Sequence, residues 1–459
     1  LSTVTLFYQV ILQLYCTALH MASFTIGKYD LTALQSYHPC CWLNEDVAQH
    51  IPEQLPLQID HLNDAQQRWK DLRPVLSSLF PEQSPLGTIQ SPLRRASNTF
   101  RGMLGLPASC TLLIKEDSKL AVCGSVKARG GLYETFVFAQ KINNDWSLDA
   151  DNKTPLLDAI KEGLMEDYRV IVGSTGNLGL SVGLAASSMG MKSTVHMSKD
   201  AKEWKKILLR ERGSNVEEHA GSYGVAVAEG RRSAETDAFA HFVDDEQSKT
   251  LFLGYACAAF ELYDQLEEME IDKEQQIVVH IPCGVGGAPS GICWGLKHVF
   301  GNRVAVFFAE PTHAPCVLLA MGSETKSEPP AITTCSHLGL DVLTDADGLA
   351  CGKASPLCLT MMEHLVEGIY TVDDEQLFVR LNQLVEIEGE DAFMEPSCCA
   401  SLEGPRHLAW MAEHASEEQT RNKCAQMLEN TIHIMWSTGG SLVPMEERKK
   451  FCERGNKLS

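Results

Sequence analysis

Lys127 lies in the segment 124–131, which reads Gly-Ser-Val-Lys-Ala-Arg-Gly-Gly. Small residues and glycines on both sides leave the backbone free to approach a bound group. A lysine that is partly desolvated loses its proton more readily, and the neutral amine is a nucleophile toward a carbonyl carbon. Lys127 is therefore a candidate Schiff-base lysine. The alternative is an ordinary surface lysine beside a glycine turn, and the charged run 115–119 just upstream is predicted to be a polar loop.

A glycine-rich loop follows the apolar run 277–282 and contains Gly284, Val285, Gly286 and Gly287. Glycines let successive backbone N–H groups point inward, and a helix after the loop adds the positive end of its dipole. A phosphate group is therefore the expected ligand. The glycine spacing departs from the dinucleotide-binding fingerprint, which argues against a nicotinamide cofactor. A glycine turn without any ligand is the alternative.

The segment 174–179, Ser-Thr-Gly-Asn-Leu-Gly, also connects an apolar run to a helical one. Its backbone N–H groups, Gly176 included, suit a substrate carboxylate. The hydroxyls of Ser174 and Thr175 suit the same carboxylate, and Asn177 adds a side-chain donor to a neighbouring oxygen. Alternatively, either hydroxyl only caps the helix that follows.

Thr438 precedes two glycines near the end of the chain and could give its hydroxyl to a heteroaromatic nitrogen. A lone threonine in a turn would carry no such meaning. Together, however, a nucleophilic lysine, a phosphate cup, a carboxylate loop and a neutral hydroxyl donor describe a pyridoxal phosphate site. That description is more economical than four unrelated turns.

The elements that must position these residues alternate between strand and helix. Short apolar runs typical of buried parallel strands come before the loops. The predicted strands cover 110–114, 169–173, 194–197, 215–219, 277–282, 304–309 and 431–436; the predicted helices cover 64–76, 128–141, 180–189, 201–212, 225–237, 251–267, 292–300, 373–384 and 417–428. This alternation predicts a doubly wound α/β fold with two sheets, or one sheet with an inserted lobe.

The chain of 459 residues is long enough for two domains. We predict an N-terminal arm and the first part of a large domain over residues 1–125, and a small α/β domain over 126–245. The rest of the large domain, with the phosphate loop, covers 246–459. The long N-terminal arm would cover one flank of the core, which favours a monomer.

The composition and charge of the chain indicate which partners it can bind and which compartment it occupies. A formal net charge of −21 and a pI near 5.1 argue against nucleic acid or an anionic membrane surface as a partner. Sixteen cysteines include no C-x-x-C pair, so we interpret them as reduced core thiols of a cytoplasmic protein. The apolar run 4–16 is shorter than the roughly 20 residues of a membrane span. It also lacks the basic start of a secretory signal. A targeting segment upstream of residue 1 stays an open question.

Segments along the chain resemble the bacterial-type D-serine dehydratases, which belong to the tryptophan synthase β-like, fold-type II group of pyridoxal phosphate enzymes. The resemblance runs in order over residues 27–446 and is carried by segments 124–131, 174–179, 195–198, 244–246, 282–287, 307–315, 345–350, 395–397 and 437–440. Several of these segments distinguish the family from its L-serine and L-threonine relatives. The family loop tends to have glycine where this chain has Ala288 and Ser290, a change at the rim that leaves the inner glycines intact.

The resemblance implies an α/β fold-type II enzyme with two domains, each with a mostly parallel sheet flanked by helices. The implied reaction is the pyridoxal-phosphate-dependent elimination of D-serine to pyruvate and ammonia. Lys127 would form the Schiff base with the cofactor, and Asn177 would meet its phenolic oxygen. The loop from Gly284 to Gly287 would hold the phosphate, and Thr438 would face the pyridine nitrogen. These assignments leave residues 174–176 to bind the substrate.

Three questions stay open at this point. Lys127 and Thr175 both qualify for handling the α-proton, because a D-isomer presents that hydrogen on the opposite face if its carboxylate is held alike. Glu310 either ligates a monovalent cation such as potassium or is a simple charge at a strand end. The alternative activity is an L-serine or L-threonine dehydratase. The alternative from another class is a non-catalytic protein that binds a cofactor or an amino acid. The presence of Lys127, Asn177 and the glycines argues against this alternative.

Overall fold

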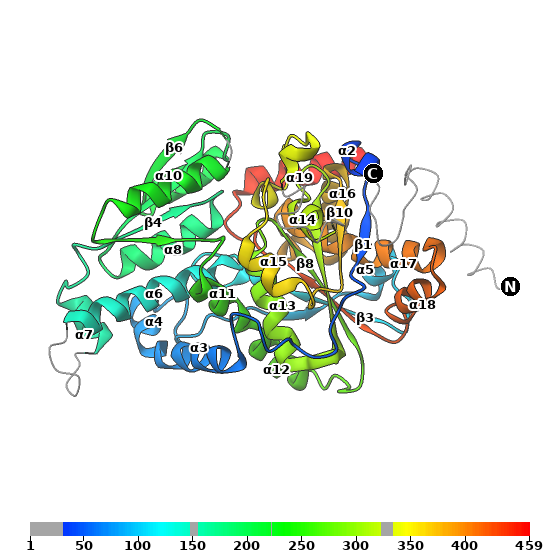
Figure 1. The fold of residues 1–459 in the computed structure, drawn as a ribbon, viewed down its shortest axis with the longest axis horizontal. Helices are drawn as coiled ribbons and strands as arrows, with labels where there is room; N and C mark the ends of the chain where they lie inside the picture. Colours follow the sequence, from blue (N-terminus) through cyan, green and yellow to red (C-terminus); the bar gives the residue numbers. More distant parts are fainter. Residues whose placement is uncertain (1–30, 147–154, 222, 323–333) are drawn as a thin grey trace.

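The structure, a computed structural model, describes residues 31–146, 155–221, 223–322 and 334–459. Within these residues the strands form two sheets (Figure 1). The apolar run 4–16 lies outside the described residues. None of the helices in the described ranges combines the length and the apolar character needed to cross a bilayer.

The larger sheet has the strand order β1-β10-β9-β8-β11-β3-β2. Its five inner strands run parallel to one another, and the short edge strands β1 and β2 are antiparallel to their neighbours. Strands β8 to β11 of this sheet are buried along their whole length, as expected for parallel strands covered on both faces. The bounds are β1 Cys41–Leu43, β2 Leu93–Arg95, β3 Thr111–Lys115, β8 Ile277–Pro282, β9 Val304–Pro311, β10 Gly368–Val372 and β11 Ile432–Trp436.

The smaller sheet has the order β6-β5-β4-β7, and all of its strand pairs are parallel. The bounds are β4 Arg169–Gly173, β5 Lys192–Ser198, β6 Asn215–His219 and β7 Ala240–Val243. Helices α8 and α10 pack on it. Figure 1 shows this unit on one side of the molecule and the larger sheet on the other.

Helices cover both sheets, and α6 connects the two units because it contacts α8 of the small unit and α11 of the large one. The bounds are α2 Leu31–Gln35, α3 Ile59–Asp71, α4 Arg73–Leu79, α5 Asn98–Met103, α6 Lys127–Trp146, α7 Leu156–Lys161, α8 Asn177–Ser188, α9 Glu203–Glu211, α10 Tyr223–Glu235, α11 Lys249–Ala256, α12 Ala258–Glu268, α13 Gly287–Phe300, α14 Cys316–Met321, α15 Pro356–Met362, α16 Asp374–Glu388, α17 Gly404–His414, α18 Glu418–Gln426 and α19 Met445–Leu458.

The predicted α/β class is confirmed, and every predicted strand lies within a few residues of an observed one. The prediction of a single helix over 251–267 is wrong, because the segment forms two helices, α11 and α12, that are separated at Cys257. Strands β1, β2, β7 and β10 were not predicted. The strands of the smaller sheet fall between residues 169 and 243, inside the predicted small domain. The domain boundaries themselves stay a prediction.

Candidate functional site

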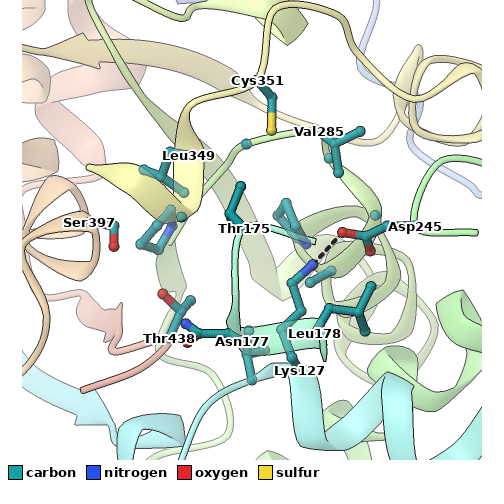
Figure 2. A pocket seen from close by; sticks show the side chains of 18 of the residues that line it. Lys127, Thr175, Asn177, Leu178, Asp245, Val285, Leu349, Cys351, Ser397 and Thr438 are labelled. Atoms are coloured by element: carbon teal, nitrogen blue, oxygen red, sulfur yellow. Dashed lines mark hydrogen bonds and ion pairs between the residues drawn. The ribbon is translucent and has the colours of Figure 1, made fainter. Parts of the chain in front are cut away.

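The predicted chemical residues converge on one cavity of about 740 Å³, open solvent at its mouth included (Figure 2). Each lies in the segment that follows a parallel strand: Lys127 after β3, residues 174–177 after β4, the glycine loop after β8 and Thr438 after β11. In open α/β sheets, ligands bind at the carboxyl ends of the strands. The residues from the predicted set that line the cavity are Lys127, Ser174, Thr175, Asn177, Gly284, Val285, Gly286, Gly287 and Thr438.

Lys127 begins helix α6, and its side chain is 19% exposed. Its Nζ lies 2.6 Å from Oδ2 of Asp245 and 5.6 Å from the centre of the Tyr255 ring. Ser181 of α8 donates a hydrogen bond to the Lys127 carbonyl oxygen at 2.8 Å, which fixes the start of α6 against the small unit. The lysine is therefore held inside the cavity, and the alternative of an ordinary surface lysine is excluded.

Asp245 is a site residue that the sequence reasoning missed. It follows β7, one of the strands that were not predicted, and it lines the cavity. Its Oδ1 is buried and has no hydrogen-bond partner within the described part of the chain. Asp245 could have been predicted as a site residue from its position at the carboxyl end of a parallel strand, but that strand was not recognised in the sequence.

The glycine loop has the geometry that a bound anion requires. Gly286 is in the left-handed region with φ 104°, and helix α13 begins at Gly287. A Cβ on Gly287 would lie 2.8 Å from the Asp245 carbonyl oxygen, and a Cβ on Gly284 would lie 3.1 Å from the backbone of Gly348. The first N–H groups of a helix have no partner inside it, so this loop presents free donors at the positive end of a dipole.

The 174–176 loop differs in part from what was predicted. Ser174 Oγ accepts hydrogen bonds from the backbone N–H groups of Gly176 at 2.9 Å and Gly179 at 3.0 Å. This is the helix-capping alternative, although Ser174 still lines the cavity. Gly176 is not among the lining residues; with φ 142°, a Cβ there would lie 2.5 Å from Cδ of Lys205. A glycine is needed at position 176 because a side chain there would overlap Lys205.

Asn177 connects the small unit to the large one through a chain of polar contacts. Its Nδ2 donates to Oε1 of Glu395 at 2.8 Å. Lys205 of α9 is almost fully buried, and its Nζ lies 3.8 Å from Oε2 of Glu395 and 2.8 Å from Oδ2 of Asp347. Burial raises the pKa of Glu395, and Lys205 opposes that shift. These contacts hold Asn177 in one orientation at the cavity wall.

The hydroxyl of Thr438 contacts an uncharged thiol. Its Oγ1 lies 3.1 Å from Sγ of Cys398, and that sulfur also accepts a hydrogen bond from the Gly439 N–H at 3.0 Å. Burial raises the pKa of the Cys398 thiol to about 12, so the thiol is uncharged. Ser397 lines the cavity beside it, and its buried Oγ lacks a hydrogen-bond partner among the described residues.

Glu310 does not line the cavity. It is fully buried near the end of β9, and its two oxygens accept hydrogen bonds from the N–H groups of Val317 and Leu318, each at 2.8 Å. Burial raises the pKa of this carboxyl to about 8, although the two backbone bonds oppose the shift. The carboxyl thus caps α14, so Glu310 has a structural role beyond that of a simple charge at a strand end. Its role as a cation ligand stays a prediction.

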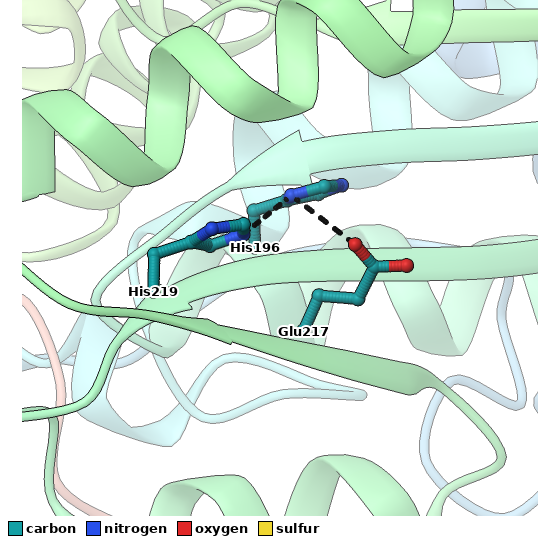
Figure 3. Close-up of side chains that lie close together, drawn as sticks. All are labelled: His196, Glu217 and His219. Carbon is teal, nitrogen blue, oxygen red and sulfur yellow. Dashed lines mark hydrogen bonds and ion pairs between the residues drawn. The ribbon is translucent and has the colours of Figure 1, made fainter.

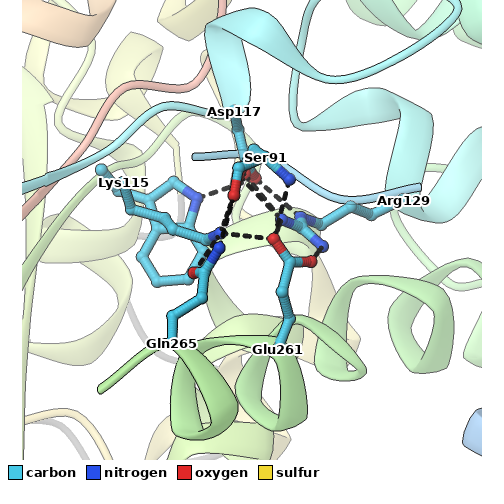
Figure 4. A network of polar contacts seen from close by, with 7 residues as sticks. Ser91, Lys115, Asp117, Arg129, Glu261 and Gln265 are labelled. Atoms are coloured by element: carbon cyan, nitrogen blue, oxygen red, sulfur yellow. Dashed lines mark hydrogen bonds and ion pairs between the residues drawn. The ribbon is translucent and has the colours of Figure 1, made fainter. Parts of the chain in front are cut away.

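A buried network of charges supports the start of α6 (Figure 4). Asp117 accepts hydrogen bonds from Arg129 at 2.7 and 2.8 Å, from Ser91 at 2.6 Å and from the indole N–H of Trp436 at 2.8 Å. Arg129 also donates to Glu261 at 2.7 Å. Arg129 lies two residues after Lys127, and Trp436 lies two residues before Thr438. Asp117 therefore positions both cavity loops.

The prediction that 115–119 forms a polar loop is wrong for Lys115 and Asp117, which are fully buried. Lys115 is the last residue of β3 and forms an ion pair with Glu261 of α12. Charges that compensate one another can be buried, and here the partner of Lys115 is 146 residues away in sequence.

A family model described as pyridoxal-phosphate dependent enzyme matches residues 86–420. The chain belongs to the pyridoxal-phosphate dependent enzymes. A probable D-serine dehydratase from Burkholderia lata is 42% identical over 443 residues, which cover 95% of this chain and 97% of the relative. One from Bacillus cereus (strain B4264) is 39% identical over 450 residues, covering 94% and 99%. These relatives confirm the resemblance carried by the sequence segments.

Solved structures of the same fold include diaminopropionate ammonia lyase from Escherichia coli in complex with D-serine. It has a TM-score of 0.70 and 18% sequence identity, and the match covers 92% of this chain and 98% of that chain. At this identity the likeness shows the fold, and it confirms the predicted fold-type II architecture.

The residues present fit pyridoxal phosphate. The cavity has glycine amides on one wall and a lysine amine on another. Two buried polar atoms that line it, Asp245 Oδ1 and Ser397 Oγ, have no partner in the described protein and are available to a ligand. The loop from Gly284 to Gly287 would take the phosphate and Lys127 the aldehyde carbon. Asn177 and Thr438 would contact the ring oxygen and the ring nitrogen.

Proposed function

We propose that this protein is a D-serine ammonia-lyase, which converts D-serine to pyruvate and ammonia with pyridoxal phosphate as cofactor. The α-hydrogen and the β-hydroxyl of D-serine leave as one water. One water is taken up again when the C=N bond of the resulting imine is hydrolysed, so D-serine yields one pyruvate and one ammonia. The relatives from Burkholderia lata and Bacillus cereus, both probable D-serine dehydratases, support this substrate because they match over nearly the whole chain.

One observation carries the proposal: Lys127 Nζ lies in the same cavity as the glycine loop at the N-terminus of α13. A nucleophilic amine and a phosphate site on one cavity are the two requirements for covalent binding of a phosphorylated aldehyde. When bound, the cofactor withdraws electrons from the α-carbon of an amino acid and so makes its α-hydrogen acidic.

Individual residues of the chain have separate roles in this reaction. Lys127 would hold the cofactor, and once released it would be a free amine inside the cavity. Asp245, 2.6 Å from Nζ, is close enough to attract the ammonium group of the incoming substrate and to orient the released lysine. Thr175 is the second candidate for handling the α-proton. Thr438 would offer a neutral hydroxyl to the ring nitrogen. A hydroxyl would not keep that nitrogen protonated as a carboxylate would, which favours rapid elimination over transamination.

The test measures cofactor attachment and substrate choice together. The purified protein, loaded with pyridoxal phosphate, is reduced with borohydride and digested, and the labelled peptide is identified. Pyruvate is then assayed with D-serine, L-serine and L-threonine. We expect the label on Lys127 and the highest rate with D-serine. Lys127→Ala should lose the label, while Lys119→Ala, a change at an exposed lysine, should keep it.

Each other outcome has a defined meaning. A label on a different lysine overturns the site. A higher rate with L-serine or L-threonine favours the alternative dehydratase. Label on Lys127 without pyruvate from any substrate favours the non-catalytic binding protein.

We further propose a monomer in the cytoplasm. Buried free thiols such as Cys283, Cys293 and Cys316 are consistent with a reducing compartment. Light scattering of the purified protein gives its mass in solution, and a mass of about twice 50.6 kDa would overturn the monomer. Fractionation of cells that produce the protein locates it.

A further inference from the structure

Two histidines and a glutamate cluster on the small sheet, away from the cavity (Figure 3). His196 belongs to β5, and Glu217 and His219 belong to β6. His196 pairs with Glu217 in the parallel register, and His219 is two residues further along β6. Because side chains two residues apart on a strand share a face, all three project from the same face of the sheet. This is the face that α10 covers, since a Cβ on its Gly230 would lie 3.3 Å from the His196 ring.

The ligand atoms are already close together. His196 Nδ1 lies 2.9 Å from Nε2 of His219 and 3.7 Å from Oε2 of Glu217, and all three atoms lie within 4.8 Å of one another. Zinc–nitrogen bonds of about 2.0 Å at the tetrahedral angle place two ligand atoms about 3.3 Å apart. The two observed distances lie on either side of that value. Small side-chain adjustments would therefore bring the three atoms around one ion.

The chemical state of the residues also suits a metal. Metals bind the neutral imidazole ring through the nitrogen that carries no proton. Glu217 supplies a negative charge, and its side chain is 50% exposed, which gives an ion a path from solvent. His219 is partly buried, and its ring is stacked on that of His196 at an interplanar angle of 10°.

We propose that His196, Glu217 and His219 bind one divalent transition-metal ion of the zinc class, with a fourth position open to water. Two imidazoles and one carboxylate suit Zn²⁺ and Co²⁺, whereas Mg²⁺ and Ca²⁺ prefer all-oxygen sites. The ion cross-links β5 to β6. Helix α10, which follows β6, begins at Tyr223, a residue that lines the cavity. The metal therefore stabilises an edge of the small unit next to the active site and takes no part in the reaction.

The test uses the full-length, cofactor-loaded protein after treatment with a chelator and removal of the chelator. Co²⁺ is titrated in, and the visible d–d bands of tetrahedral Co²⁺ are recorded beyond the absorption of the cofactor. We expect one equivalent to bind. His219→Gln should lose the bands, and Glu217→Gln should weaken Co²⁺ binding by at least tenfold. His313→Gln is the matched control, because His313 pairs with a single carboxylate, Asp341, at 2.8 Å.

A second readout does not depend on spectra. Zn²⁺ should raise the thermal unfolding midpoint of the wild type and of His313→Gln but not that of His219→Gln, since an ion that binds only the folded state stabilises it. Equal midpoints of the chelated proteins would show that His219→Gln folds. Tetrahedral bands that persist in His219→Gln, or the absence of such bands in the wild type, would overturn the site.

Discussion

Lys127 and Asp245 are 118 residues apart in sequence, and their side chains meet at 2.6 Å inside the cavity. The lysine starts α6, and the aspartate follows β7 of the smaller sheet. The contact therefore depends on the way the small sheet is placed against the large one. The aspartate side chain is only 7% exposed, so its charge is poorly screened by water.

Asp245→Asn should lower kcat/KM for D-serine by about 10- to 100-fold, the range expected when a hydrogen bond to a charged group loses that charge. The neutral amide attracts the ammonium group of the substrate less strongly than the carboxylate does. Steady-state assays measure this loss, and the cofactor absorption shows whether loading is unchanged. Asp244→Asn is the matched control, since Asp244 pairs with Arg231. An equal loss in both variants would contradict a specific role for Asp245.

Thr175→Ala distinguishes the two candidates for handling the α-proton. If Thr175 carries the proton, exchange of the α-hydrogen of D-serine with deuterated water should fall by about 100-fold, the lower range for loss of a general acid or base. Lys127→Ala provides the comparison. Exchange at the wild-type rate in Thr175→Ala would leave Lys127 as the group that moves the proton. Mass spectrometry of recovered D-serine gives the rate.

The alternation of strands and glycine loops was predictable because each loop directly follows a buried apolar run. The run 277–282 and the loop from Gly284 to Gly287 are contiguous, so local sequence contains the whole signal. The same holds for β4 and the 174–177 loop. Lys127, Asn177 and Thr438 were grouped into one site from their residue types, and the resemblance supplied their individual roles. Their presence on one cavity agrees with that grouping.

Long-range electrostatics could not be predicted in this way. Lys115 and Asp117 have the composition of a surface turn, and they are buried only because Arg129 and Glu261 balance their charges. Strand β10 is fully buried but has no glycine loop after it, so nothing local marks its role. Such contacts are properties of the assembled sheets.

Asp117→Asn should destabilise the protein by about 3–5 kcal/mol, because it leaves the buried guanidinium of Arg129 without one of its two carboxylates. Urea unfolding followed by circular dichroism measures the free energy of unfolding. Glu267→Gln is the control: it breaks an exposed pair with Lys273 and should cost less than about 1 kcal/mol. Similar losses in the two variants would show that the Asp117 network adds little stability.

Glu310→Gln should change the pH dependence of stability. The pKa of Glu310 is about 8 in the folded protein, against an ordinary value of 4.5, so the folded state holds the proton more tightly than the unfolded state. Its contribution to stability is complete below pH 4.5 and is lost as the pH rises through 8. The slope is at most about 1.4 kcal/mol per pH unit. Glutamine does not titrate, so the variant should lack this decline, and parallel wild-type and variant profiles would contradict the shifted pKa.

The same pair of proteins tests potassium at Glu310. A cation that binds the ionised carboxylate of the folded state should raise wild-type stability near pH 8 in potassium chloride relative to a tetraalkylammonium chloride of equal concentration. Glu310→Gln should respond equally to the two salts, because it has no charge to offer. Thermal unfolding midpoints in the two salts provide the measurement. A wild-type midpoint that is the same in both would rule out a cation at this carboxyl and leave Glu310 as the cap of α14.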